Sequence, residues 1–388
     1  MAGVPTHLIE EFAKRFPGSP QPRFFRAPGR VNLIGEHTDY NAGLVLPIAI
    51  NLAAYTVAAP CAERCLEVYS REVDELRCWD IDKVRTLNPS GRKIWTDYVL
   101  GVAQQLHRAG YPPQPTRIYI DSAVPVGSGL SSSAALEVSV ALALLWGRAI
   151  PRTELAKLCQ RAENQFVGVP SGIMDQYAAL YGEEGAAIRI DCRNLTHETV
   201  KLPPSVEVVA VNSMVKHSLG ESAYGERVRE CRTAVEILRN QGLDIESLRD
   251  VSSGDVELYK GAMPEVVYRR AKHVTTEIER VVQFTEACEA RDVELMGKLF
   301  VASHRSLQYD YQVSAPELDF LVDRALAIPG VYGSRMTGGG FGGCTVSLVR
   351  RDAVDSFEQA IRDAYRREFA IDAPVYRCEA SEGARELV

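Results

Sequence analysis

The sequence predicts an α+β protein of two domains. Its 388 residues suffice for two domains of ordinary size. Strand-like and helix-like segments are mixed along the chain, without the regular βαβ alternation of a doubly wound sheet. The apolar and charged fractions, 46% and 24%, are typical of a protein that buries a core. A shift in pattern near residue 180 divides the chain into domains of residues 1–180 and 181–388.

The elements of the first part follow from periodicity and turn residues. Apolar stretches at 31–34 and 44–46 flank the turn-rich segment 39–43, which predicts strand, turn and strand. Residues 95–107 read as a helix, 117–120 as a strand, and 134–146 as an apolar helix. In 152–166, apolar residues recur at three- and four-residue steps, which predicts an amphipathic helix.

The second part is expected to be richer in helix. Strands are predicted at 187–190, 206–211 and 345–349, and helices at 223–240, 266–291 and 353–369.

Charge and composition exclude several functions. The net charge is −7 and no long basic stretch is present, so nucleic acid is not an expected partner. The longest apolar run, 134–146, is interrupted by Glu137 and Ser139 and is too short to cross a bilayer. The start of the chain carries no signal-peptide pattern. Nine scattered cysteines read as reduced thiols, so we expect a cytoplasmic protein.

A first glycine-rich segment precedes the apolar helix. Glycines let the backbone approach a ligand, and a helix N-terminus favours an anion, so the segment predicts a phosphate site. The alternative is a loop whose serines cap a buried helix. The segment lacks the Gly-x-x-x-x-Gly-Lys-Ser/Thr pattern of the nucleotide hydrolases. Its residues are Gly127, Ser128, Gly129, Leu130, Ser131, Ser132 and Ser133.

A second glycine-rich segment, 338–343, formally matches the dinucleotide-binding pattern. We reject that match, because the pattern must open a helix and here a predicted strand follows. Five glycines in six positions instead predict close packing against a ligand or another loop.

A third segment, 26–41, crowds polar groups into a turn between apolar strands. A solvated turn would explain some of them. A polyol such as a sugar would explain more, because each hydroxyl needs both a donor and an acceptor. The polar residues are Arg30, Glu36, His37, Asp39 and Asn41.

Together and in this order, the three segments resemble the galactokinase, homoserine kinase and mevalonate kinase superfamily. Residues 29–40 look like the galactokinase signature itself, and the resemblance continues through 168–176, 222–227 and 334–343. It implies two α+β domains with the active site in the cleft between them. It also implies transfer of the ATP γ-phosphate to the C1 hydroxyl of galactose, which is the first step of galactose catabolism.

The resemblance assigns the catalytic and nucleotide-binding roles. Asp175 is the implied base and Arg30 its partner, with a helix cap as the alternative for Asp175. Mg²⁺ is placed between Ser133 and Glu163, with Ser132 as a further candidate, although Glu163 could be a solvated flank. The Gly127–Ser133 loop would hold the phosphates. Trp95 and Tyr98 would pack near adenine, unless they belong to the core.

The same resemblance places sugar-binding groups around the ring of galactose. Asp39 is the expected contact to the carbon-4 hydroxyl. The remaining groups are Glu36, His37, Tyr224 and the backbone of Gly172, together with Arg30 and Asp175.

Two alternatives remain. One is a kinase of N-acetylgalactosamine, arabinose or another sugar, against which Thr38 and the turn 41–43 favour galactose. The other is a galactose sensor that binds ligands and a repressor without catalysis; such sensors lack the Ser-Ala pair that Ser133 and Ala134 retain here. The sequence carries no signal for an oligomeric state.

Overall fold

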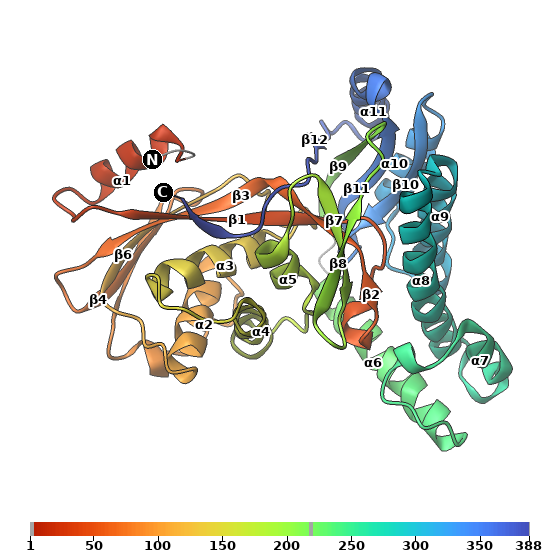
Figure 1. Ribbon diagram of the computed structural model, residues 1–388, viewed down its shortest axis with the longest axis horizontal. Helices are drawn as coiled ribbons and strands as arrows, with labels where there is room; N and C mark the ends of the chain where they lie inside the picture. Colours follow the sequence, from red (N-terminus) through yellow and green to blue (C-terminus); the bar gives the residue numbers. More distant parts are fainter. Residues whose placement is uncertain (1–3, 217–219, 388) are drawn as a thin grey trace.

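The computed structural model describes residues 4–216 and 220–387 of the chain. Three β-sheets, of six, four and three strands, and the helices that cover them form two lobes (Figure 1). The six-stranded sheet belongs to the first lobe and the four-stranded sheet to the second. The three-stranded sheet lies between them (Figure 1).

The six-stranded sheet is antiparallel except where β4 pairs with β6. Because successive side chains of a strand point to opposite faces, Phe24 and Phe25 enter different cores. Phe24 packs against α1 (Thr6–Arg15), whereas Phe25 faces the helices on the other side. In spatial order the strands are β13 (Arg385–Leu387), β1 (Arg23–Asn32), β3 (Pro47–Pro60), β6 (Thr116–Ser122), β4 (Cys65–Ser70) and β5 (Glu75–Asp80).

Four helices cover the Phe25 face of this sheet (Figure 1). They are α2 (Trp95–Arg108), α3 (Ser132–Leu145), α4 (Arg152–Arg161) and α5 (Met174–Tyr181). A π-helix, Ala162–Val167, continues α4.

The four-stranded sheet of the second lobe is also buried on both faces. Val208 and Ala210 of β9 pack toward α8 and α9, whereas Val209 and Val211 pack toward α10 and α11. The strands are, in order, β10 (Val331–Thr337), β11 (Gly342–Arg350), β9 (Val206–Lys216) and β12 (Val375–Arg377). The helices are α6 (Gly220–Asn240), α7 (Ser253–Leu258), α8 (Glu265–Ala290), α9 (Val293–Ser306), α10 (Pro316–Leu326) and α11 (Val354–Phe369). The small middle sheet joins β2 (Leu44–Val45), β7 (Ala186–Asp191) and β8 (Thr196–Lys201).

The α+β class is confirmed, and so is each predicted helix. The strand predicted at 31–34 is the end of the longer β1, which leaves the ladder after Asn32. The sequence did not predict most of β3, whose alanines favour strands weakly, or the edge strand β5, whose residues are mostly exposed. The domain boundary near residue 180 stays a prediction.

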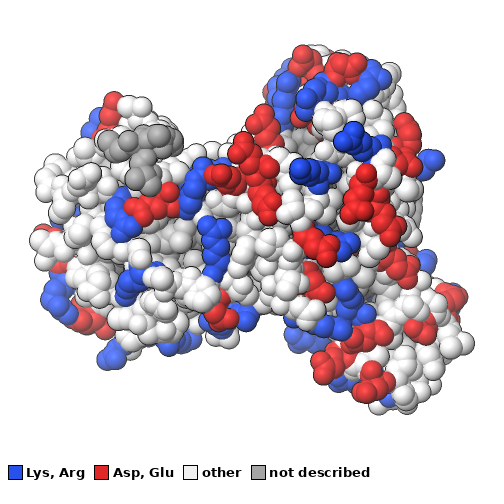
Figure 2. Space-filling view, in the orientation of Figure 1, with Lys and Arg blue, Asp and Glu red and all other residues white. Residues whose placement is uncertain are grey.

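The surface carries no field of a single charge on the face seen in Figure 2, where acidic and basic side chains alternate over both lobes. Within the described ranges, no helix combines the length and the apolar character needed to span a bilayer.

Candidate active site

Two cavities meet between the lobes. The first, of about 300 Å³, is lined by the polar turn after β1, by the segment before α5, by Tyr224 of α6 and by the glycine-rich turn between β10 and β11. The second, of about 370 Å³, is lined by α2, by the loop before α3 and by Ser131, Ser132 and Ser133. Six residues line both: Arg30, Lys93, Gly127, Gly129, Asp175 and Gly339.

An ion pair stands where the cavities meet. Arg30 Nη2 lies 2.8 Å from Asp175 Oδ1. The other terminal nitrogen of Arg30, Nη1, donates to the carbonyl of Gly129 at 2.5 Å. The hydroxyl of Ser131 donates to Asp175 Oδ2 at 2.6 Å. Asp175 is not the cap of α5, because that position belongs to Ile173. The pairing that the resemblance implied is therefore present, and the carboxylate faces both cavities.

Glu163 lies beside this pair in the π-helix. Its side chain is buried, with 5% of the residue exposed, so the solvated-flank interpretation is wrong. Ser171 and Gln176 donate to its Oε2, and the Ser133 hydroxyl also bonds the carboxylate. Burial raises the pKa of Glu163. A buried carboxylate next to a hydroxyl at a cavity wall is a donor set that suits a hard cation.

Asp39 is seated against the backbone before α5. Its Oδ1 accepts the amide of Tyr40 at 2.9 Å, and its Oδ2 lies 3.4 Å from the amide of Met174. A Cβ atom on Gly172 would stand 1.7 Å from Oδ2, so only glycine fits beneath this carboxylate. Burial, and then the negative charge of Asp175, raise the pKa of Asp39 to about 6.

His37 lines the first cavity. Its Nδ1 bonds the hydroxyl of Tyr40 at 2.8 Å, whereas its Nε2 is buried and has no partner. Burial lowers the pKa of His37 to about 3, so the ring is neutral. The ring of Tyr224 lies 5.4 Å from that of His37 and completes this wall. The contact of His37 with a sugar hydroxyl stays a prediction.

Both carboxylate oxygens of Glu36 accept hydrogen bonds from other residues of the chain. Oε1 accepts the amide of Gly338 at 2.7 Å and the hydroxyl of Thr337 at 3.1 Å, and Oε2 accepts the amide group of Asn32 at 2.6 Å. Glu36 thus fastens the glycine-rich turn to β1 while it lines the first cavity. Its contact with a sugar hydroxyl stays a prediction.

The glycine-rich turn packs against the phosphate loop, as the sequence predicted. A Cβ atom on Gly343 would come within 2.8 Å of the Ser128 carbonyl, and one on Gly338 within 3.0 Å of the Gly129 carbonyl. Strand β11 begins within this run, at Gly342, which agrees with the rejection of the dinucleotide pattern. The two loops therefore form one wall between the cavities.

Two predicted phosphate-loop residues turn their side chains away from the cavities. Leu130 is buried in the core, and the Ser128 hydroxyl donates to the carbonyl of Pro125 at 2.7 Å. These side chains shape the loop. Trp95 and Tyr98, in contrast, line the second cavity, and Trp95 Nε1 donates to Glu75 at 3.0 Å.

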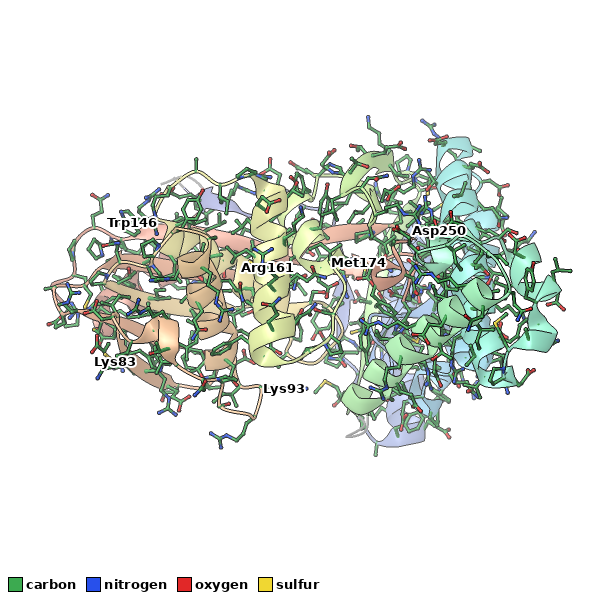
Figure 3. All side chains as sticks on the ribbon, turned by 90° about the horizontal axis from the view of Figure 1, so that it is seen from below. Lys83, Lys93, Trp146, Arg161, Met174 and Asp250 are labelled. Carbon is green, nitrogen blue, oxygen red and sulfur yellow. The ribbon has the colours of Figure 1, made fainter. Side chains whose placement is uncertain are left out.

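Lys93 is a cation that the sequence analysis missed. It has a left-handed backbone, with φ of 53°, in a loop fixed by Asp97, whose carboxylate accepts the amides of Ser90 and Ile94. Figure 3 shows Lys93 on the side of the first lobe that faces the second. The sequence does not predict a left-handed backbone at a lysine, because glycine and asparagine are the residues that commonly indicate that conformation.

Comparisons with known proteins identify the family of the chain. Family models match at residues 10–60 (the galactokinase galactose-binding signature), 97–183 (the N-terminal domain of GHMP kinases) and 284–367 (the C-terminal domain of GHMP kinases). The chain is 46% identical to a galactokinase of Roseiflexus sp. (strain RS-1) over 94% of this chain and 92% of the relative. It is 43% identical to the Homo sapiens galactokinase over 93% and 91%.

Solved structures give the same result. The galactokinase of Lactococcus lactis in complex with galactose has a TM-score of 0.93 at 36% identity and covers 98% of this chain and 99% of its own. The mevalonate kinase of Methanococcus jannaschii, at 20% identity and a TM-score of 0.67, covers 95% of this chain and 100% of its own and shares the fold. The chain belongs to the galactokinase family of the GHMP kinases.

Proposed function

We propose that this protein transfers the γ-phosphate of ATP to the C1 hydroxyl of galactose. The observation that carries the proposal is the meeting of two cavities at Arg30 and Asp175. One cavity holds the sugar-signature residues, and the other holds the serines at the start of α3. The galactokinases to which the chain is similar support galactose and ATP as its substrates.

The geometry supports the following roles for the groups at the junction. The Asp175 carboxylate accepts or orients the proton of the C1 hydroxyl, whose oxygen then bonds the γ-phosphorus while the bond to ADP breaks. Arg30 and Lys93 line both cavities, so the negatively charged phosphoryl group would pass close to them during transfer. The amides at the start of α3 favour the phosphates.

Mg²⁺ fits the donor set that Ser133 and Glu163 provide. No cluster of three or more metal-binding side chains exists among the described residues, so most of the coordination would come from water and phosphate oxygens. When bound, the ion neutralises phosphate charge. Glu163, which lines the first cavity, and Ser133, which lines the second, would hold it where the two cavities meet.

Asp39 is our choice for the residue that selects galactose. Galactose and glucose differ in the orientation of one hydroxyl, on carbon 4. A buried carboxylate left unpaired by the epimer costs several kcal/mol, which gives a discrimination of about 10³-fold or more. The close packing of Asp39 against Gly172 fits this role, because the backbone of Gly172 leaves the carboxylate no room to move toward it.

An ADP-release assay with a panel of sugars tests the proposal. We expect turnover with galactose and 2-deoxygalactose, and essentially none with glucose. Preference for N-acetylgalactosamine or arabinose would assign the chain to the alternative kinases. Binding of galactose and ATP without turnover would favour the sensor class instead.

We also place the protein in the cytoplasm. All nine cysteines are free in the structure, and the Sγ atoms of Cys61 and Cys65 lie 3.7 Å apart without a bond. Free thiols are typical of a reducing compartment. Fractionation of the native cells, with thiol titration of the purified protein, tests this placement.

A further inference from the structure

A buried glutamine joins two carboxyl groups behind the active site. Gln176 follows Asp175 on α5 and has 0% of its surface exposed. Its Nε2 donates to Glu163 Oε2 at 3.0 Å and to Glu137 Oε2 at 2.9 Å. Both hydrogens of the amide nitrogen are thereby used, one on each carboxyl group.

Glu137 is the deeper of the two carboxyl groups. It lies one turn after Ser133 on α3, is 0% exposed, and has no cationic partner among the described residues. The charged groups that face it are Glu163 and Asp175, both negative, and the nearby Cys159 thiol is also buried. Burial, and then the charge of Glu163, raise the pKa of Glu137 well above its usual range. This environment favours the neutral form of its carboxyl group.

The atoms without partners point to the same arrangement. Glu137 Oε1 and Gln176 Oε1 are both buried. If Glu137 is ionised, neither oxygen has a hydrogen-bond partner, because both are acceptors. These are the remaining oxygens of the two side chains that the 2.9 Å bond already joins. A hydroxyl on Glu137 Oε1 that donates to Gln176 Oε1 would satisfy both oxygens and close a ring of two hydrogen bonds.

We propose that Gln176 is a positioning residue that aims the Glu163 carboxylate at Mg²⁺, and that Glu137 fixes the orientation of the Gln176 amide. The inference rests on the proposed function, which assigns Glu163 to the metal. The second hydrogen-bonded layer around a metal ligand commonly fixes its orientation in this way.

The chemistry of the amide suits this role. A lysine or arginine at position 176 would also hold Glu163, but its charge would compete with the cation for the carboxylate. The neutral amide donates to Oε2 without that competition. Ser171 donates to the same oxygen, so neither of these two donors occupies Glu163 Oε1.

Three substitutions and a matched control test the proposal. Gln176→Leu removes the donor, Glu137→Leu removes its anchor, and Glu137→Gln keeps the ring, because an amide can both accept from and donate to Gln176. Tyr177→Phe is the control, since it removes a buried hydrogen bond from the same helix on the side of Leu195. The measurements are the Mg²⁺ concentration for half-maximal rate, kcat at saturating Mg²⁺, Mg²⁺ affinity in the presence of ADP by calorimetry, and galactose affinity without nucleotide.

Both leucine variants should raise the half-maximal Mg²⁺ concentration and weaken the calorimetric Mg²⁺ affinity by about 10-fold or more. Galactose affinity should stay within about twofold of wild type, because a twofold change is smaller than the loss of one hydrogen bond to the sugar would cause. Glu137→Gln and Tyr177→Phe should keep the Mg²⁺ requirement of the wild type. An unchanged requirement in both leucine variants overturns the proposal, as does a defect in Glu137→Gln equal to that of Glu137→Leu.

An infrared difference spectrum covers the case in which the leucine variants do not fold. Wild type minus Glu137→Gln should show the carbonyl stretch of a protonated carboxyl group at neutral pH, and its absence overturns the ring. Glu163→Gln separates this inference from the proposed function. If it leaves the Mg²⁺ requirement unchanged, the metal assignment fails. If it raises the requirement while the leucine variants do not, the positioning role alone fails.

Discussion

Replacing Gly172 with alanine should disable galactose recognition without unfolding the protein. The added Cβ atom would stand 1.7 Å from Asp39 Oδ2, 2.0 Å from Cγ and 2.5 Å from Oδ1, so the whole carboxylate must move. Because an ordinary van der Waals contact begins at about 3.4 Å, Oδ2 must move by about 1.7 Å or more. Misplacement of a substrate-positioning group by about 1 Å can cost about 10²-fold. We therefore expect kcat/KM for galactose to fall by about 10²-fold, or about 2.7 kcal/mol.

The assay compares galactose kinetics and thermal stability in the wild type and four variants. Gly261→Ala is the matched control, because nothing lies within 4 Å of the Cβ atom that it would add. Asp39→Ala removes the group that the new methyl would strike. If Gly172→Ala acts through Asp39, it should have little further effect in the Asp39→Ala background. Losses that multiply in the double variant, or wild-type kinetics for Gly172→Ala, would refute the reasoning.

Three further outcomes are expected. Asp175→Asn should lower kcat by about 10²–10⁴-fold while calorimetry still detects galactose binding, and retention of a tenth of the wild-type turnover would contradict the role of Asp175. Asp39, with its pKa raised to about 6, becomes protonated as the pH falls below that value, so kcat/KM for galactose should decline there, and Asp39→Asn should abolish this limb of the pH profile. Lys93→Ala should lower kcat/KM for ATP by about 10-fold or more through loss of a charged contact, whereas the exposed Lys83→Ala should not; equal effects would exclude Lys93 from the phosphate path.

Helices and strands were predictable because the spacing of apolar residues within one short segment indicates the type of element. The amphipathic helix at 152–166 is an example, although its last turn is a π-helix that holds Glu163 at the cavity. The sequence pattern showed only that Glu163 lies at the edge of the apolar face. In the structure the Glu163 side chain also accepts a hydrogen bond from Ser171, a contact that the pattern does not contain.

Long-range polar contacts could not be predicted. Arg335 is fully buried and donates to the carbonyls of Asn32 and Leu33 at 3.2 and 2.8 Å, which ties β10 to the end of β1. Its partners lie some three hundred positions away, and nothing near Arg335 signals them. Glu137 similarly read as an interruption of an apolar run, because its pairing with Gln176 exists only in the folded chain.

The strand β13 has a consequence for the order of synthesis. Residues 385–387 pair with β1 and supply the edge strand of the first sheet, and Glu386 forms an ion pair with Arg23. Nearby, the amides of Gly383 and Ala384 bond the carbonyls of Gly182 and Ala179 at 2.8 and 2.7 Å. Residues 24–26 of β1 therefore leave the ribosome long before β13, their second partner strand, is synthesised. The nascent first lobe therefore keeps the edge of β1 at residues 24–26 unpaired until residue 387 has left the exit tunnel, and the first sheet is completed only when synthesis is nearly finished.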